Sequence, residues 1–181
     1  AGQGVLAAQM SRGRNFLGFL GNFSSRTPLR LFCSSSLTQL QSWEAKLIDL
    51  FHSHAPIADL TGMRLRFDGE ETVVELPYNN KLDSSPRPGR LLGSTHGGVY
   101  CLLADTAGWF ASARGREGGW PLTTTLSCHF VKSSKEKDIA ARARVVQSSP
   151  RQDICEVRIV DKEGLDLAYV TAVFAVAARK G

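Results

Sequence analysis

The chain has 181 residues, 43% of them hydrophobic, which is enough for one domain with an apolar core. It contains no apolar run of the roughly 18 residues that a membrane-spanning helix needs, so we expect no membrane span. The formal charge of +5 lies almost wholly in residues 1–43, where the charged residues are four arginines; the other 18 of the 22 basic residues face 17 acidic ones, and a nucleic-acid partner is not indicated.

The first 36 residues differ in composition from the rest of the chain. They are rich in Ser, Phe, Leu and Arg and contain no Asp or Glu. This composition is typical of an organellar transit peptide, and the alternative is a disordered basic head. We therefore expect residues 1–36 to be a targeting segment or a disordered head, residues 37–181 to be the folded domain, and the protein to be mitochondrial, with another organelle or the cytoplasm as alternatives.

The folded part begins with a predicted amphipathic helix at residues 36–51, where apolar side chains recur at spacings of three and four. The members of this stripe are Leu40, Trp43, Leu47, Leu50 and Phe51. Two strands, at residues 62–67 and 72–78, are predicted to form a hairpin around Asp68-Gly69. Residues 79–94 contain prolines, glycines and serines without periodicity, which predicts a long loop, and long loops in compact domains are commonly functional.

A central helix is predicted from the stretch STHGGVYCLLADTAGWFASA, residues 94–113, and four strands complete the domain. The strands are expected at residues 122–131, 138–146, 154–160 and 167–178. In the first of them Leu122, Leu126, Cys128 and Phe130 alternate with Thr123, Thr125, Ser127 and His129, which puts the two sets on opposite faces. One long helix and about six mostly antiparallel strands predict an α+β fold in which the sheet wraps the central helix.

The four cysteines give no sign of a metal or redox site. Cys33, Cys101, Cys128 and Cys155 are far apart in the sequence, with no C-x-x-C pair and no His at zinc-finger spacing. We expect buried, reduced thiols, no metal and no cofactor.

Asp105 is a carboxylate within the otherwise apolar or small-residue central helix. At about 100° per residue, Val99, Leu103, Ala107 and Phe110 form the stripe that faces the sheet, and Asp105 points nearly the other way. The residues on its side are Gly98, Cys101, Gly108 and Ser112, with Trp109 at the edge. A solvated helix face normally carries Lys, Glu, Arg and Gln, so the small residues predict that another surface, most simply a second subunit, packs here.

The start of the same helix is suited to an anion. His96-Gly97-Gly98 precedes it, so the unpaired amides of its first turn project from the positive end of the helix dipole, and glycine lets a substrate approach that backbone closely. Such a site can hold the oxyanion formed when a carbonyl is attacked. On one helix this end lies roughly 10–12 Å from Asp105, too far for one carbonyl, but antiparallel pairing of two chains would bring the two together.

The pattern Gly93-x-x-His96-Gly97-Gly98, followed by Ala104-Asp105, resembles the signature of hotdog-fold acyl-CoA thioesterases, in the phenylacetate-pathway and thioesterase-superfamily-member branch. The resemblance covers about residues 37–178 and implies a hotdog fold, an acyl-CoA substrate and a homodimer or homotetramer. The Gly-rich turn alone is weak evidence for this family, because lipases also use such a turn. Lipases, however, carry a G-x-S-x-G motif after it, and none follows here.

The resemblance also implies roles for individual residues. Asp105 would be the general base or the nucleophile, the Gly97 amide would polarise the thioester carbonyl, and Thr123 would orient the attacking water. His96 would touch the substrate as a catalytic residue, or it would cap the helix or bond the loop, and Gly98 would line the substrate site. Lys132, Lys135 and Arg151 lie where relatives bind the CoA moiety.

Arg90 departs from the family pattern, because relatives usually carry Asn or Gln six residues before the His. Asn79 or Asn80 could take that place, or Arg90 itself could pair with Asp105 or contact a CoA phosphate. Two other functions remain open: an acyl-CoA or acyl-carrier-protein dehydratase of the same fold, and a CoA-binding protein without turnover.

Overall fold

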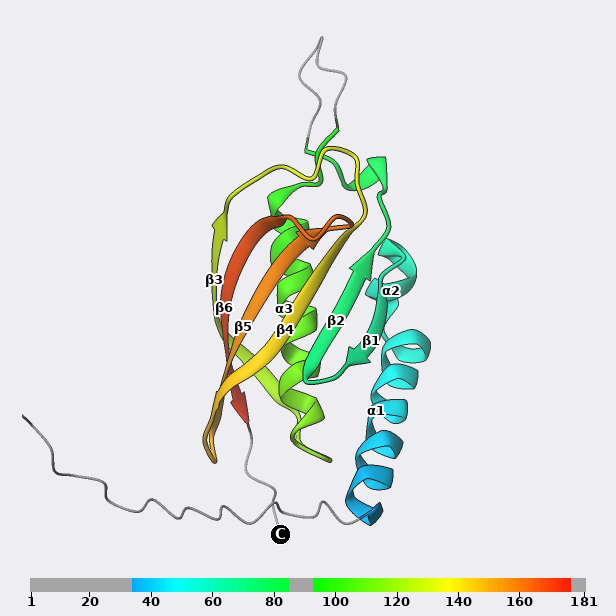
Figure 1. Ribbon diagram of the computed structural model, residues 1–181, viewed down its shortest axis with the longest axis vertical. Coiled ribbons are helices and arrows are strands. Elements are labelled where there is room, and N and C mark those ends of the chain that lie inside the picture. The colour runs from blue at the N-terminus through cyan, green and yellow to red at the C-terminus, as the bar shows by residue number, and fades with distance from the viewer. Residues whose placement is uncertain (1–33, 85–92, 177–181) are drawn as a thin grey trace, which may run out of the picture. The chain divides into compact units, whose positions relative to one another are not determined.

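Six antiparallel strands form one sheet that curves around a single long helix in the computed structural model, which describes residues 34–84 and 93–176 (Figure 1). The helix is α3 (Gly97–Arg114). The strands are β1 (Arg64–Asp68), β2 (Glu71–Leu76), β3 (Pro121–Phe130), β4 (Ile139–Ser148), β5 (Gln152–Asp161) and β6 (Asp166–Val176). Their order across the sheet is β1-β2-β4-β5-β6-β3, so β1 and β3 are the edge strands. The predicted α+β fold, with a central helix wrapped by about six antiparallel strands, is confirmed.

Three further helical elements complete the described structure. Helix α1 (Ser34–His54) corresponds to the predicted amphipathic helix, and its Leu47 and Phe51 are each only 1% exposed. The short helix α2 (Pro56–Thr61) and the 3-10 helix Asn80–Leu82 were not predicted. Pro56 starts α2 and Gly62, at φ 75°, ends it in the left-handed region, so both signals were present in the sequence.

The predicted boundary at residue 37 falls inside α1, which begins at Ser34. Residues 1–33 of the predicted targeting segment, and Arg90 of the predicted site, lie outside the described residues. In the part of the chain that the structure covers, no helix combines the length and the hydropathy needed to cross a membrane.

Helix α3 packs on the sheet through the predicted stripe. Leu103 and Ala107 are fully buried and Phe110 is 6% exposed, and they join Val74, Val157 and other strand residues in one apolar core. Apolar burial of this kind is the main favourable term in folding.

The small residues on α3 have a different role from the one predicted. Gly108 and Ser112 are buried against the protein's own sheet, not left for a second subunit. A methyl group added at Gly108 would lie 2.9 Å from the Phe174 ring of β6, and the Ser112 hydroxyl donates to Asp153 of β5. The small side chains therefore let α3 approach β5 and β6 closely, and this part of the predicted subunit face is wrong.

Strand β3 does not keep the alternation that its sequence predicts. Thr123 pairs with Phe174 and Thr125 with the next residue, Val173, so Thr124 is an additional residue in a β-bulge. The bulge changes which side chains face α3: Thr123 turns toward the helix, while Leu122 is 70% exposed. The prediction that Leu122 shares one face with Leu126, Cys128 and Phe130, opposite Thr123, is wrong because strict alternation ends at the bulge.

A buried carboxylate fixes the far end of α3 to the β4–β5 hairpin. The side chain of Asp153 is 2% exposed and accepts hydrogen bonds from Ser112 (2.6 Å), Ser148 (2.6 Å) and the Arg116 guanidinium (2.6 Å). Burial alone would raise the pKa of Asp153, but the hydrogen bonds from Arg116, Ser112 and Ser148 outweigh it and hold this pKa below its ordinary value.

Replacing Asp153 with Asn is expected to lower the free energy of unfolding at neutral pH by about 3–5 kcal/mol, because it leaves the Arg116 charge without its partner. Since the folded-state pKa of Asp153 is depressed, its contribution is complete above the unfolded pKa of about 4 and is lost as the pH falls through the folded-state value. In urea unfolding, the difference between wild type and variant should therefore shrink below about pH 4.

The matched control is Glu156→Gln on the same strand. Glu156 pairs with Arg144, and the two side chains are 54% and 64% exposed, so this change should cost less than about 1 kcal/mol. An Asp153→Asn effect that stays constant with pH would contradict the assignment.

Candidate active site

The candidate site lies in the seam between α3 and β3, where the Thr123 hydroxyl donates a 2.7 Å hydrogen bond to Oδ1 of Asp105. Both side chains are partly exposed. The bond occupies one carboxylate oxygen and leaves Oδ2 to accept from another group, while the threonine oxygen can still accept a hydrogen bond itself. The structure thus brings together two of the residues that the sequence analysis singled out.

Contacts between α3 and β3 recur along the helix. Four α3 residues at successive spacings of four face β3, because such residues lie on one side of a helix. The pairs are Gly97 with Phe130, Cys101 with Cys128, Asp105 with Thr123, and Trp109 with Pro121. At the last pair the indole N–H of Trp109 donates to the Pro121 carbonyl at 2.7 Å. Asp105 therefore sits in the middle of a continuous contact, on an element that cannot easily shift.

The start of α3 is capped by His96. Its Nδ1 accepts a hydrogen bond from the Gly98 amide at 2.9 Å, and the Val99 amide donates to the His96 carbonyl at 2.8 Å. Of the roles open for His96 the structure shows helix capping, and the Gly98 amide is engaged by the cap. Among the described residues the Gly97 amide has no hydrogen-bond acceptor, so it remains a donor at the helix terminus.

A short ladder holds this helix start in place. The His96 amide donates to the Leu82 carbonyl at 2.9 Å, and the Ser84 amide donates to the Ser94 carbonyl at 2.8 Å. The buried Thr95 is tied to the β3–β4 connection, because its amide donates to Ser134 Oγ at 3.1 Å. The Gly97 amide is therefore presented from a fixed backbone.

Gly97 and Asp105 of one chain cannot serve the same carbonyl. Eight residues separate them on α3, which at about 1.5 Å per residue is roughly 12 Å along the helix axis. The predicted site has two parts, the Gly97 amide and the Asp105 carboxylate. In a single chain they lie too far apart to act on one carbonyl.

Exposed apolar side chains lie at both ends of the edge strand β3. Trp120 and Leu122, at its start, are 61% and 70% exposed, and Phe130 and Val131, at its end, are 57% and 52% exposed. An edge strand with unpaired backbone groups and exposed apolar side chains is the kind of surface that pairs with another chain.

The other predicted residues are spread over both ends of the molecule. Lys132 and Lys135 are exposed in the β3–β4 connection, which begins where β3 reaches Gly97. Arg151 lies in the β4–β5 turn, where its carbonyl accepts from Val176 near the other end of the sheet. Asn79 caps the 3-10 helix by accepting from the Lys81 amide at 3.0 Å, so its side-chain oxygen is engaged locally. His129, which was assigned no role, is an exposed residue of β3.

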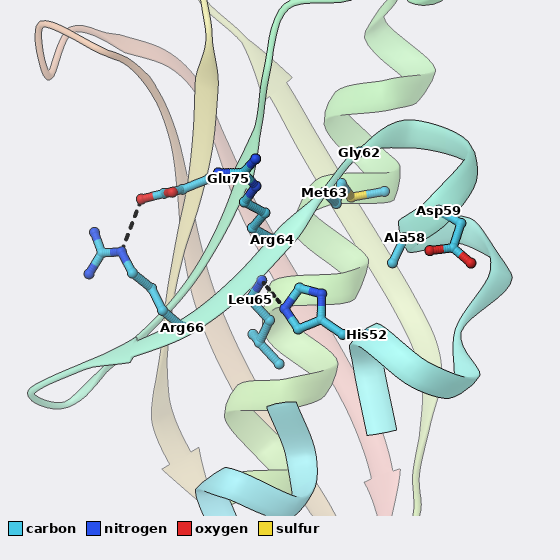
Figure 2. A pocket seen from close by; sticks show the side chains of 9 residues that line it. All are labelled: His52, Ala58, Asp59, Gly62, Met63, Arg64, Leu65, Arg66 and Glu75. Carbon is cyan, nitrogen blue, oxygen red and sulfur yellow. Dashed lines mark hydrogen bonds and ion pairs between the residues drawn. The ribbon is translucent and has the colours of Figure 1, made fainter. Parts of the chain in front are cut away.

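A cavity of about 580 Å³ opens elsewhere, between α1, α2 and the β1–β2 hairpin (Figure 2). His52, Arg64 and Glu75 are among its lining residues, and His52 Nε2 accepts a 3.5 Å hydrogen bond from the Leu65 amide on the free edge of β1. None of the residues that line this cavity belongs to α3 or β3. It is therefore separate from the Asp105–Thr123 pair, and its mixed charges do not define a ligand.

Sequence reasoning missed two features of the seam. The bulge at Thr124 has no glycine or proline to announce it, and the closeness of Cys101 to Cys128 depends on a helix and a strand that are distant in sequence. Within residues 34–84 and 93–176, no group of three or more His, Cys, Asp or Glu side chains is arranged to hold a metal ion.

Comparison with known proteins agrees with this architecture. A sequence model of the Thioesterase superfamily matches residues 92–168, and no curated protein matches the chain. Among solved structures, a thioesterase from Haemophilus influenzae is 18% identical, with a TM-score of 0.64 over 76% of this chain and 92% of that one. A mutant thioesterase from Pseudomonas aeruginosa is 19% identical, with a TM-score of 0.62 over 73% and 92%.

A third structure, of a putative esterase from Mycobacterium tuberculosis, is 20% identical, with a TM-score of 0.61 over 70% of this chain and all of that one (100%). The structural likeness concerns the fold, and the family match concerns the segment that includes α3 and β3. The chain thus has the hotdog fold, and its residues 92–168 match the sequence model of the Thioesterase superfamily. Both findings agree with the resemblance that its Gly-rich turn and Ala104-Asp105 indicated.

Proposed function

We propose that the protein hydrolyses acyl-CoA thioesters to the free acid and CoA, with Asp105 as the general base. The family match and the thioesterase neighbours support thioester hydrolysis in general. The single observation that carries the residue assignment is the 2.7 Å hydrogen bond between Thr123 and Asp105, which orients a carboxylate on a rigid helix.

In the proposed reaction, Asp105 Oδ2 takes a proton from a water molecule while Thr123 holds Oδ1. Because the Thr123 hydroxyl gives its hydrogen to Asp105, its oxygen can accept a hydrogen bond from the same water and so orient it. The water attacks the thioester carbonyl, and the oxyanion that forms is stabilised by the Gly97 amide at a helix N-terminus. The CoA thiolate then leaves. Because a thiolate is a good leaving group, the proposed reaction requires no metal.

The two halves of this site would come from two copies of the chain. Pairing of the exposed β3 edges about a twofold axis would cover Trp120, Leu122 and Phe130 and would set the two α3 helices antiparallel. The Gly97 amide of one copy would then lie near Asp105 of the other. The proposed active form is therefore a homodimer or a homotetramer built from such dimers.

The phosphates of CoA would be bound by basic side chains around this interface. Lys132 and Lys135 are exposed near the helix start, and Arg151 is exposed at the opposite end of the same chain. In an antiparallel dimer, groups from opposite ends of two chains approach each other, which is consistent with all three contributing. Arg90 is a further candidate, and the basic head supports a mitochondrial location.

Replacing Asp105 with Asn should lower kcat for acyl-CoA hydrolysis by about 10²- to 10⁴-fold, because the amide keeps the shape but accepts no proton. Thiol release from short, medium, long and aryl acyl-CoAs measures the effect, and circular dichroism checks the fold. Asp59→Asn is the matched control, since Asp59 is an exposed carboxylate at the separate cavity. Equal turnover by wild type and Asp105→Asn would end the assignment.

Replacing Thr123 with Val should lower kcat about 10- to 100-fold, because a hydrogen bond to a charged group contributes roughly 1.5–3 kcal/mol. Thr123→Ser keeps the hydroxyl and should retain most of the activity. Thr125→Val, at an exposed position two residues along β3, should behave as wild type in the same assay. A Thr123→Val enzyme with normal turnover would show that Asp105 needs no such partner.

Replacing Gly97 with Pro should lower kcat about 10²- to 10³-fold, because it removes the amide N–H at the first helical position, where proline is otherwise favoured. Gly97→Ala is the matched control: it keeps the amide and adds a similar Cβ, which would lie 3.2 Å from the Phe130 ring. Comparable losses in both variants would argue for a steric effect instead.

Mixed dimers test whether the site is shared between chains. Co-expressed Gly97→Pro and Asp105→Asn chains would form one site that has both a wild-type Gly97 amide and a wild-type Asp105. Recovery of thiol release by separately purified mixed dimers, over either variant alone, is the expected result. No recovery in dimers shown to be mixed by mass would contradict a site made from two chains.

A further inference from the structure

We propose that Cys101 and Cys128 form a redox-active thiol pair that closes to an intramolecular disulfide between α3 and β3. The first argument is positional. Cys101 lies four residues from both Gly97 and Asp105 on α3, and these two residues contact β3 at Phe130 and Thr123. Cys128 lies between Phe130 and Thr123 on the strand and, beyond the bulge, has the same parity as Phe130.

The second argument is the environment of the two sulfurs. Burial, and after it the charge and hydrogen bonding of the Cys101 thiol, raise the pKa of Cys128 to about 11. Both cysteines are partly exposed, whereas Cys155 is fully buried and its thiol is directed to the Gly108 carbonyl at 3.6 Å.

The chemistry requires a low-molecular-weight disulfide, such as oxidised glutathione, as the oxidant. Because Cys128 is held as a thiol, Cys101 attacks first: its thiolate bonds to one glutathione sulfur, the glutathione S–S bond breaks, and one glutathione thiolate leaves. Cys128 then gives up its proton and attacks Cys101 Sγ, releasing the second glutathione. Two cysteine thiols are oxidised to one disulfide, and one disulfide is reduced to two thiols.

The bond would form inside the candidate site. Cys101 is one helical turn before Asp105, so a covalent link to β3 fixes the spacing of the two elements that carry Asp105 and Thr123. We expect the disulfide form to have lower turnover. This effect on turnover rests on the proposed function, whereas formation of the disulfide does not.

The test uses the full chain with Cys33→Ser, so that the remaining cysteines are Cys101, Cys128 and Cys155. The protein is equilibrated in buffers of increasing oxidised-to-reduced glutathione ratio, alkylated with N-ethylmaleimide, and analysed by intact mass and by non-reducing peptide mapping. The expected product is a peptide pair joined through Cys101 and Cys128, with Cys155 alkylated and no glutathione retained. Cys155→Ser is the control and should give the same product.

The single variants show whether the two thiols react with each other or independently with glutathione. Cys128→Ser should keep one glutathione on Cys101, because no second thiol displaces it, and Cys101→Ser should leave Cys128 alkylated. Stable glutathione on Cys101 in a chain with both cysteines, or two free thiols at every ratio, would overturn the disulfide.

Turnover is followed in parallel by the absorbance of the thioester bond, because the buffers contain thiols. The linked form should lose turnover and regain it on reduction with dithiothreitol. A disulfide that forms without changing turnover would overturn its proposed effect on the site. A disulfide that forms in a protein without any hydrolase activity would overturn the proposed function and leave the thiol pair established.

Discussion

The β-bulge at Thr124 is the constraint on which the candidate site depends. A strand alternates its side chains, so one additional residue moves every side chain before it to the opposite face. The bulge brings Thr123 to within 2.7 Å of Asp105 and turns Leu122 outward, where it is 70% exposed. Exposing a leucine forgoes about 1.5–3 kcal/mol of burial, and the proposed partner copy would restore it by covering the β3 edge.

Helix α3 can carry this arrangement because it is held at both ends and along one side. His96 caps its start, the Asp153–Arg116 network fixes the turn after its end, and Gly108 lets it lie against Phe174. The remaining side is the seam with β3, which contains a hydrogen-bond donor at Gly97, a thiol at Cys101 and a carboxylate at Asp105. A rigid helix thus presents three chemically different groups at intervals of one turn along one strand.

The family match and the structural likeness cover different parts of the chain. The superfamily match, residues 92–168, runs from just before α3 to the first residues of β6 and so includes the whole seam. The structural likeness reaches 70–76% of the chain in the proteins described, at identities of 18–20%.

The sequence by itself determined the elements and their order, because hydrophobic periodicity and turn residues are local signals: the amphipathic helix, the hairpin, the central helix and the four strands are all found. It also singled out Asp105, Gly97 and Thr123. Tertiary structure alone decided which faces meet. Gly108 and Ser112 pack on the protein's own sheet, Thr123 faces the helix, and Cys101 lies beside Cys128. These contacts depend on strand register and on pairing between distant segments, which a bulge of one residue can reverse and which local patterns do not encode.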